Sequence, residues 1–112
     1  MVFANRTRDA VTVLGKAAKL MPDSVEAQLS YGDALIRSGD YSAAVTTLRG
    51  VKDVPAAAMW RYRYNMAYGL YKLGDVAASK AQLGSARQFA GNARENESLD
   101  QLEAALRRMP GW

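Results

Sequence analysis

Residues 30–41 read Ser-Tyr-Gly-Asp-Ala-Leu-Ile-Arg-Ser-Gly-Asp-Tyr, and residues 65–76 repeat this pattern as Asn-Met-Ala-Tyr-Gly-Leu-Tyr-Lys-Leu-Gly-Asp-Val. The glycines of the two Gly-Asp pairs, Gly39 and Gly74, lie 35 positions apart, a period typical of stacked helical repeats. Each unit of such an array buries its apolar face only by packing on its neighbours. The surface that results usually binds a partner rather than performing chemistry.

The spacing of apolar residues around these two stretches predicts an all-α chain of about six helices. We expect helices near residues 5–20, 24–37, 41–52, 56–72 and 76–90, and a last helix that begins with a capping box at Ser98-Leu99-Asp100-Gln101. At each Gly-Asp pair, the glycine suits the left-handed end of one helix and the aspartate suits the start of the next. The turns are short, so successive helices should be antiparallel.

The composition argues against catalysis. The 112 residues contain no cysteine and no histidine, so the chain lacks a thiolate nucleophile, the commonest general base and the commonest metal ligand. We therefore predict no catalytic residues, no metal site and no cofactor. No apolar run approaches the ~20 residues of a membrane-spanning helix, and no segment has the order of a signal peptide. We expect a soluble protein, and the sequence does not decide between the cytoplasm and the periplasm.

The net charge of +4 is spread unevenly along the chain. Residues 56–90 carry five basic side chains and one acidic side chain, whereas residues 23–55 are net acidic. A nucleic-acid-binding module would be expected to gather its Lys and Arg in one stripe. Nucleic acid is therefore not an expected partner, and binding of nucleic acid or another anionic polymer by the basic segment is the weakest of the alternatives considered.

With these repeated positions, the chain resembles the tetratricopeptide repeat family, whose signature is W-x2-L-G-x2-Y, then A-x3-F, then P. The resemblance covers roughly residues 7–90. It departs from the family at the tryptophan place, which holds Gln28 and Arg63, at Ser79, where alanine is usual, and at Pro55, which comes one residue early. The remaining matching positions are Tyr31, Gly32, Leu35, Ala44, Leu48 and Pro55 in one unit, Met66, Ala67, Leu70 and Leu83 in the next, and Ala10, Leu14 and Pro22 before them.

The resemblance implies one domain over residues 1–112, built from antiparallel helical hairpins stacked in a short right-handed superhelix. Residues 1–22 would be the second helix of a preceding unit, residues 23–55 and 56–90 two full repeats, and residues 91–112 a C-terminal capping helix. In this family the first helix of each hairpin lines a concave groove that holds a protein or peptide segment. Small residues such as Gly32, Ala67 and Ala44 would let paired helices approach closely.

The resemblance also places the groove-lining residues. On the outward face of the two first helices, it implies contacts from Leu29, Asp33, Ile36, Arg37, Arg61, Tyr64, Tyr68, Tyr71 and Lys72. The three tyrosines recur at i, i+4 and i+7 and so share one helix face, opposite a core-facing stripe of Met66, Ala67, Leu70 and Leu73. Tyrosine and arginine dominate binding hot spots. The Lys and Asn pair by which some family members clamp a C-terminal carboxylate has no match here.

Two interpretations of function remain open beside each other. The first is a non-catalytic interaction scaffold whose Tyr/Arg-lined groove binds a partner segment. By analogy with the family, the alanine-rich composition hints at a fragment of a larger bacterial assembly or secretion-related protein. The alternative is a structural module that forms homo-oligomers through its N-terminal helix, whose apolar face lacks a hairpin mate.

Overall fold

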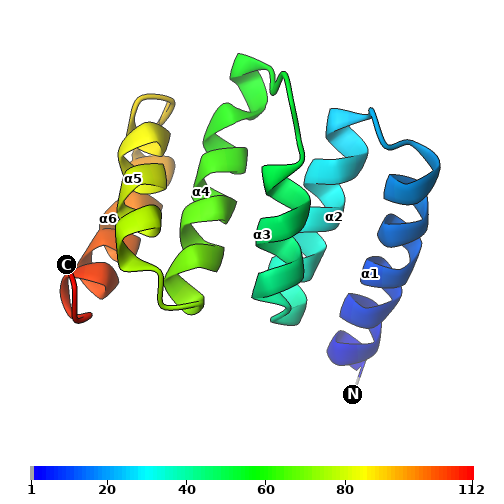
Figure 1. The fold of residues 1–112 in the computed structure, drawn as a ribbon, viewed down its shortest axis with the longest axis horizontal. Coiled ribbons are helices and arrows are strands. Elements are labelled where there is room, and N and C mark those ends of the chain that lie inside the picture. Colours follow the sequence, from blue (N-terminus) through cyan, green and yellow to red (C-terminus); the bar gives the residue numbers. More distant parts are fainter. Residues whose placement is uncertain (1) are drawn as a thin grey trace. The chain divides into compact units, whose positions relative to one another are not determined.

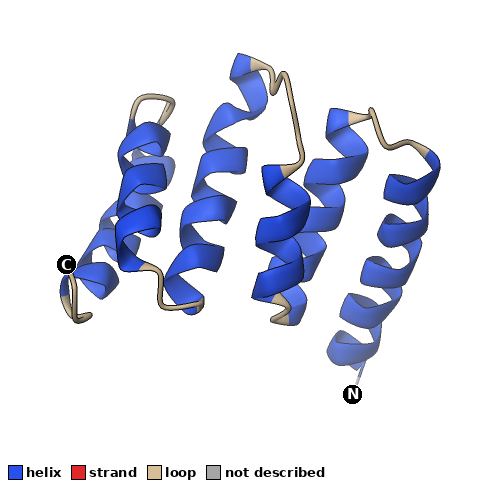
Figure 2. Ribbon diagram, in the orientation of Figure 1, coloured by secondary structure: helices blue, strands red, loops and turns tan. Residues whose placement is uncertain are grey.

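The computed structural model describes the backbone of residues 2–112 and the side chains from Arg8 onward. Within these residues the secondary structure is entirely helical, as the sequence predicts (Figures 1 and 2). Six helices follow one another: α1 Val2–Leu20, α2 Val25–Ser38, α3 Tyr41–Arg49, α4 Ala56–Lys72, α5 Val76–Arg87 and α6 Ala93–Arg107. They form two compact units, residues 1–53 and residues 54–112, and the prediction of one domain over residues 1–112 stays a prediction.

The first unit is a series of three helices in which α2 packs against both α1 and α3. Gln28, which stands at the tryptophan place of the repeat, joins α2 to the end of α1. Its side-chain Nε2 donates hydrogen bonds to the carbonyl oxygens of Ala18, at 2.9 Å, and Met21, at 3.4 Å. The last carbonyls of a helix have no partner within the helix, so this amide satisfies the carbonyl of Ala18. The carbonyl of Met21, just beyond α1, also accepts from the backbone N–H of Ser24 at 3.1 Å.

The close approach of α2 and α3 depends on a missing side chain. A Cβ atom built on Gly32 would lie 2.7 Å from Cδ2 and 3.0 Å from Cγ of Leu48, a residue with no exposed surface. Carbon atoms in favourable contact are ~3.5–4.0 Å apart, so the leucine fills the space that any larger residue at position 32 would need. The prediction that Gly32 permits close helix packing is confirmed.

The two Gly-Asp turns have the same backbone structure, one in each unit. Gly39 and Gly74 adopt φ angles of 88° and 84°, and each donates its N–H to the carbonyl three residues earlier. Asp40 and Asp75 donate their N–H to the carbonyl five residues earlier, which completes a Schellman motif. Each aspartate side chain then accepts from the N–H three residues later, at 3.3 and 3.2 Å. The repeated dipeptide therefore ends one helix and starts the next.

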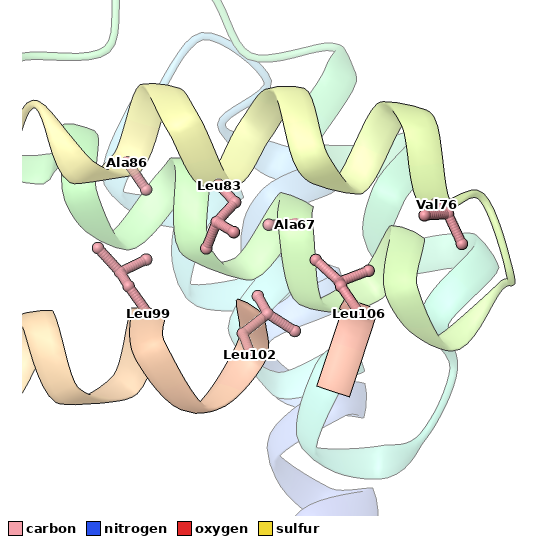
Figure 3. Packing of buried hydrophobic residues seen from close by; sticks show 7 residues of the cluster. All are labelled: Ala67, Val76, Leu83, Ala86, Leu99, Leu102 and Leu106. Carbon is pink, nitrogen blue, oxygen red and sulfur yellow. The ribbon is translucent and has the colours of Figure 1, made fainter. Parts of the chain in front are cut away.

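The second unit is an α4–α5 hairpin with α6 packed against both helices. Its core is a cluster of buried side chains contributed by all three helices (Figure 3): Ala67, Val76, Leu83, Ala86, Leu99, Leu102 and Leu106. Ser79 is also fully buried, and its hydroxyl donates a 2.6 Å hydrogen bond to the carbonyl of Ala67. The serine that departs from the family pattern therefore has its polar group satisfied.

Several helix boundaries differ from the predicted ones. Helices α3 and α5 end about three residues early, at Arg49 and Arg87. The predicted capping box at Ser98 is wrong, because α6 already begins at Ala93. The actual N-cap is Asn92, whose side chain accepts from the N–H of Glu95 at 2.8 Å, while the Glu95 carboxylate accepts from the N–H of Gly91 at 2.7 Å. The sequence therefore does carry a capping signal for α6, six residues upstream of Ser98.

Candidate functional site

Helix α4 carries four aromatic side chains on one face, an arrangement that we call the aromatic ladder: Trp60, Tyr64, Tyr68 and Tyr71. The rings of Trp60 and Tyr64 are stacked, with centroids 4.9 Å apart and planes 7° from parallel. The next two centroid distances are 6.3 and 6.1 Å, and the last pair meets edge to face. Aromatic pairs at such distances gain ~0.5–1.5 kcal/mol beyond the area that they bury, so the ladder holds its rings in place.

The rings of the ladder are in part packed on the core and in part exposed to solvent. All four rings are half-buried and pack against the hydrophobic core of the second unit. Burial raises the pKa of the Tyr64 hydroxyl above its ordinary value, and the neighbouring Tyr68 adds to the effect. At neutral pH this hydroxyl is therefore protonated and able to donate a hydrogen bond.

Lys72 closes the C-terminal end of the ladder. Its ammonium group lies 5.7 Å from the ring centroid of Tyr68 and 5.6 Å from that of Tyr71, within the range of a cation–π interaction. The residue is exposed. Two aromatic faces therefore hold the cation in place without neutralising its charge.

The ladder and α6 together enclose a shallow hollow of about 240 Å³. Helix α4 contributes Tyr64, Tyr68, Tyr71 and Lys72, and α6 contributes Gln101, Leu102 and Ala105. Lys72 is the one charged residue in this lining. Small-molecule pockets usually measure ~300–1,000 Å³, so the hollow is better suited to a side chain or two of a longer segment.

The two arginines of α4 have different surroundings. Arg63 turns toward α5, where its Nη1 donates a 2.9 Å hydrogen bond to Oε1 of Gln82. This residue occupies the tryptophan place of the second repeat, and its side chain joins α4 to α5 instead of lying at the edge of the ladder. Arg61 is half-buried.

In the first unit, the corresponding predicted contacts are arranged differently. Asp33 and Arg37 form an ion pair at 3.3 Å, and Ile36 is half-buried. Leu29 retains only 1% of its surface, so the prediction that it faces a partner is wrong. Because α2 packs against helices on two sides, its buried band is wide and includes Leu29.

One residue predicted for the core of α4 is exposed, and other site residues were not predicted. Met66, Ala67 and Leu70 are buried, but Leu73 retains 49% of its surface because it is the C-cap of the helix. Trp60 extends the ladder by one turn, and its i, i+4 spacing from Tyr64 was a usable signal. The α6 residues of the hollow gave no such signal, because their position depends on tertiary packing.

Among residues 8–112, no group of three or more acidic side chains could hold a metal ion. In the same part of the chain, no helix is both long and apolar enough to cross a bilayer.

Comparison with known proteins agrees with the repeat structure. A family model described as tetratricopeptide repeat matches residues 4–63, more than half of the chain. The comparisons with curated proteins and with solved structures gave no match. The second half of α4 and all of α5 lie beyond the matched residues, yet the turn between these two helices repeats the geometry of the turn in the first unit. Members of this family are generally protein–protein interaction modules. The chain therefore belongs to the tetratricopeptide repeat family.

Proposed function

We propose that this chain is a non-catalytic interaction module that holds a segment of a partner protein on the aromatic ladder of α4. The observation that supports the proposal most strongly is the ladder itself. It consists of large, half-exposed rings that are held by one another and by the core. Tyr and Trp offer a large contact area with few rotatable bonds, so little conformational entropy is lost when a partner binds.

The family supports the same proposal from another direction, because interaction through helical repeats is its general role. In the second unit the proposed contacts are the ladder, Arg61 and Lys72. In the first unit, Asp33, Ile36 and Arg37 offer a separate candidate surface at the equivalent positions of α2.

The test compares the wild-type protein with the double variant Tyr64→Ala/Tyr68→Ala in capture of a partner from an extract of the source cells. Removing a hot-spot side chain costs ~2 kcal/mol or more, which corresponds to about 25-fold weaker binding. The matched control is Phe89→Ala, which removes an exposed aromatic side chain that belongs neither to the ladder nor to the lining of the hollow. Circular dichroism must show unchanged helicity in both variants. Equal capture by the ladder variant and the control would overturn the proposal.

We also propose, as a second candidate, that α1 mediates self-association. Val13 and Leu20 lie two turns apart on one face of this helix and retain 63% and 82% of their surface. Apolar side chains at this spacing are what a partner helix covers. Sedimentation at increasing concentration should then show a dimer that Leu20→Glu reduces to a monomer. A wild-type protein that stays monomeric throughout would contradict this candidate.

A further inference from the structure

Two basic residues occupy equivalent places in the two repeats but have different neighbours. Arg37 on α2 and Lys72 on α4 are 35 positions apart, and each lies in the last turn of its helix. Four residues before Arg37 is Asp33, whose carboxylate lies 3.3 Å from the guanidinium group. Four residues before Lys72 is Tyr68, whose ring centroid lies 5.7 Å from the ammonium group. The basic residue of α2 therefore has a carboxylate as its neighbour, whereas the equivalent basic residue of α4 has an aromatic ring.

This exchange changes the charge that each helix presents. An ion pair cancels both charges at close range, whereas a cation–π contact positions the cation and leaves its net charge intact. On α6, Asp100 and Glu103 form ion pairs with Arg87, at 2.9 and 3.3 Å. The hollow beside the ladder therefore has a positive charge at one end and no acidic residue in its lining.

We propose that this hollow binds an acidic segment of a partner protein, placing an Asp or Glu side chain on the Lys72 ammonium and a neighbouring apolar side chain on Leu102 and Ala105. The inference rests on the proposed function and adds the chemical class of the partner. Charge complementarity selects the acid, because an uncompensated cation beside half-buried rings disfavours a basic segment. The volume of about 240 Å³ limits the occupant to one or two side chains.

The hydroxyl of Tyr64 also favours an acidic segment as the ligand. Tyr64 remains protonated at neutral pH and can donate to a carboxylate or a peptide carbonyl. The Lys72 ammonium contributes further donors. A carboxylate accepts hydrogen bonds only, so a hollow lined by these donors and by Leu102 and Ala105 suits an acidic residue next to a leucine, valine or phenylalanine.

The experiment selects binders from a library of random peptides whose two ends are both joined to the carrier, so that no terminal carboxylate contributes. Panning is carried out in parallel on the wild-type protein, on Tyr64→Ala/Tyr68→Ala, on Lys72→Glu and on Arg94→Glu. Arg94 is exposed on α6 outside the hollow, so its variant controls for the same change in net charge. Binders that require the two tyrosines should be rich in Asp or Glu beside an apolar residue. We expect Lys72→Glu to weaken them about tenfold or more and Arg94→Glu to leave them unchanged.

The outcomes show whether the acidic partner class fails alone or together with the proposed function. If tyrosine-dependent peptides are neutral or basic, or if Lys72→Glu binds the acidic peptides as well as Arg94→Glu does, the acidic partner class is wrong while the proposed function stands. If no selected peptide depends on the tyrosines, both proposals fail. A direct variant adds a second test: Tyr68→Asp gives α4 the ion pair that α2 has, and it should weaken acidic peptides in a protein that keeps its helicity.

Discussion

Replacing Gly32 with alanine should lower the stability of the protein, although alanine is the better helix former. In an exposed helix interior this change gains ~1 kcal/mol. At position 32, however, the new Cβ atom would lie 2.7 Å from a methyl group of Leu48, which is fully buried and cannot turn into solvent. Overpacking a core by one methyl group costs ~1–3 kcal/mol, so the net loss should be about 1 kcal/mol.

Gly84 provides the matched control for this prediction. It lies on an exposed face of α5, and a Cβ built there meets no atom within 4 Å. Gly84→Ala should therefore raise the free energy of unfolding by ~1 kcal/mol. Urea titrations followed by circular dichroism measure both changes, provided that the m-value stays constant.

A double-mutant cycle isolates the cause. Leu48→Ala alone should cost ~2–5 kcal/mol by leaving a cavity. In that background the clash is gone, and adding Gly32→Ala should become stabilising by ~1 kcal/mol. The sign of the Gly32 effect thus reverses with the residue at position 48. A Gly32→Ala protein that gains stability as Gly84→Ala does, or a cycle without coupling, would refute the packing argument.

Three further predictions concern the second unit. Gly74→Ala should cost about 1 kcal/mol, measured by urea titration, because position 74 has a φ of 84° that alanine adopts poorly. Ser79→Ala should cost ~0.5–1.5 kcal/mol in the same assay, since it removes the buried hydrogen bond to the carbonyl of Ala67; an unchanged midpoint would contradict this. The raised pKa of Tyr64 means that the folded protein holds this proton more tightly than the unfolded chain. The contribution of Tyr64 to the free energy of unfolding should be fully present below pH 10.0, the ordinary pKa of tyrosine, and should be lost as the pH rises above it. In Tyr64→Phe the free energy of unfolding should fall less steeply over the same pH range.

Helix type and turn chemistry were readable from the sequence because they depend on neighbouring residues. A glycine that ends a helix and an aspartate that caps the next act within five residues of backbone, and both Gly-Asp turns were predicted correctly. The α6 boundary was missed because two capping signals lay close together. The side chain of Asn92 accepts from the N–H of Glu95 in the first turn, and the Glu95 carboxylate accepts from the N–H of Gly91 just before the helix. Ser98 instead donates from within the helix to the carbonyl of Arg94.

The candidate site was only partly predictable. Spacing alone placed Tyr64, Tyr68 and Tyr71 on one helix face, because i, i+4 and i+7 neighbours share a face in any α-helix. Spacing placed Leu29 on the predicted contact face of its helix and could not show that this residue is buried. Its burial depends on the helices that pack against α2. Spacing also could not show that Arg63 turns toward Gln82.

The sequence by itself determined the repeat, the helices and the turns, because these follow from periodicity and from local backbone hydrogen bonds. It also determined that the second repeat has tyrosines where the first has Leu29, Asp33 and Ile36. Only the tertiary structure decided what those differences do. It brought Leu102 and Ala105 of α6 against the tyrosines and left the charge of Lys72 unpaired by any acidic residue of the hollow. The physical reason is that a surface depends on residues distant in sequence, and their contacts form only when the helices pack.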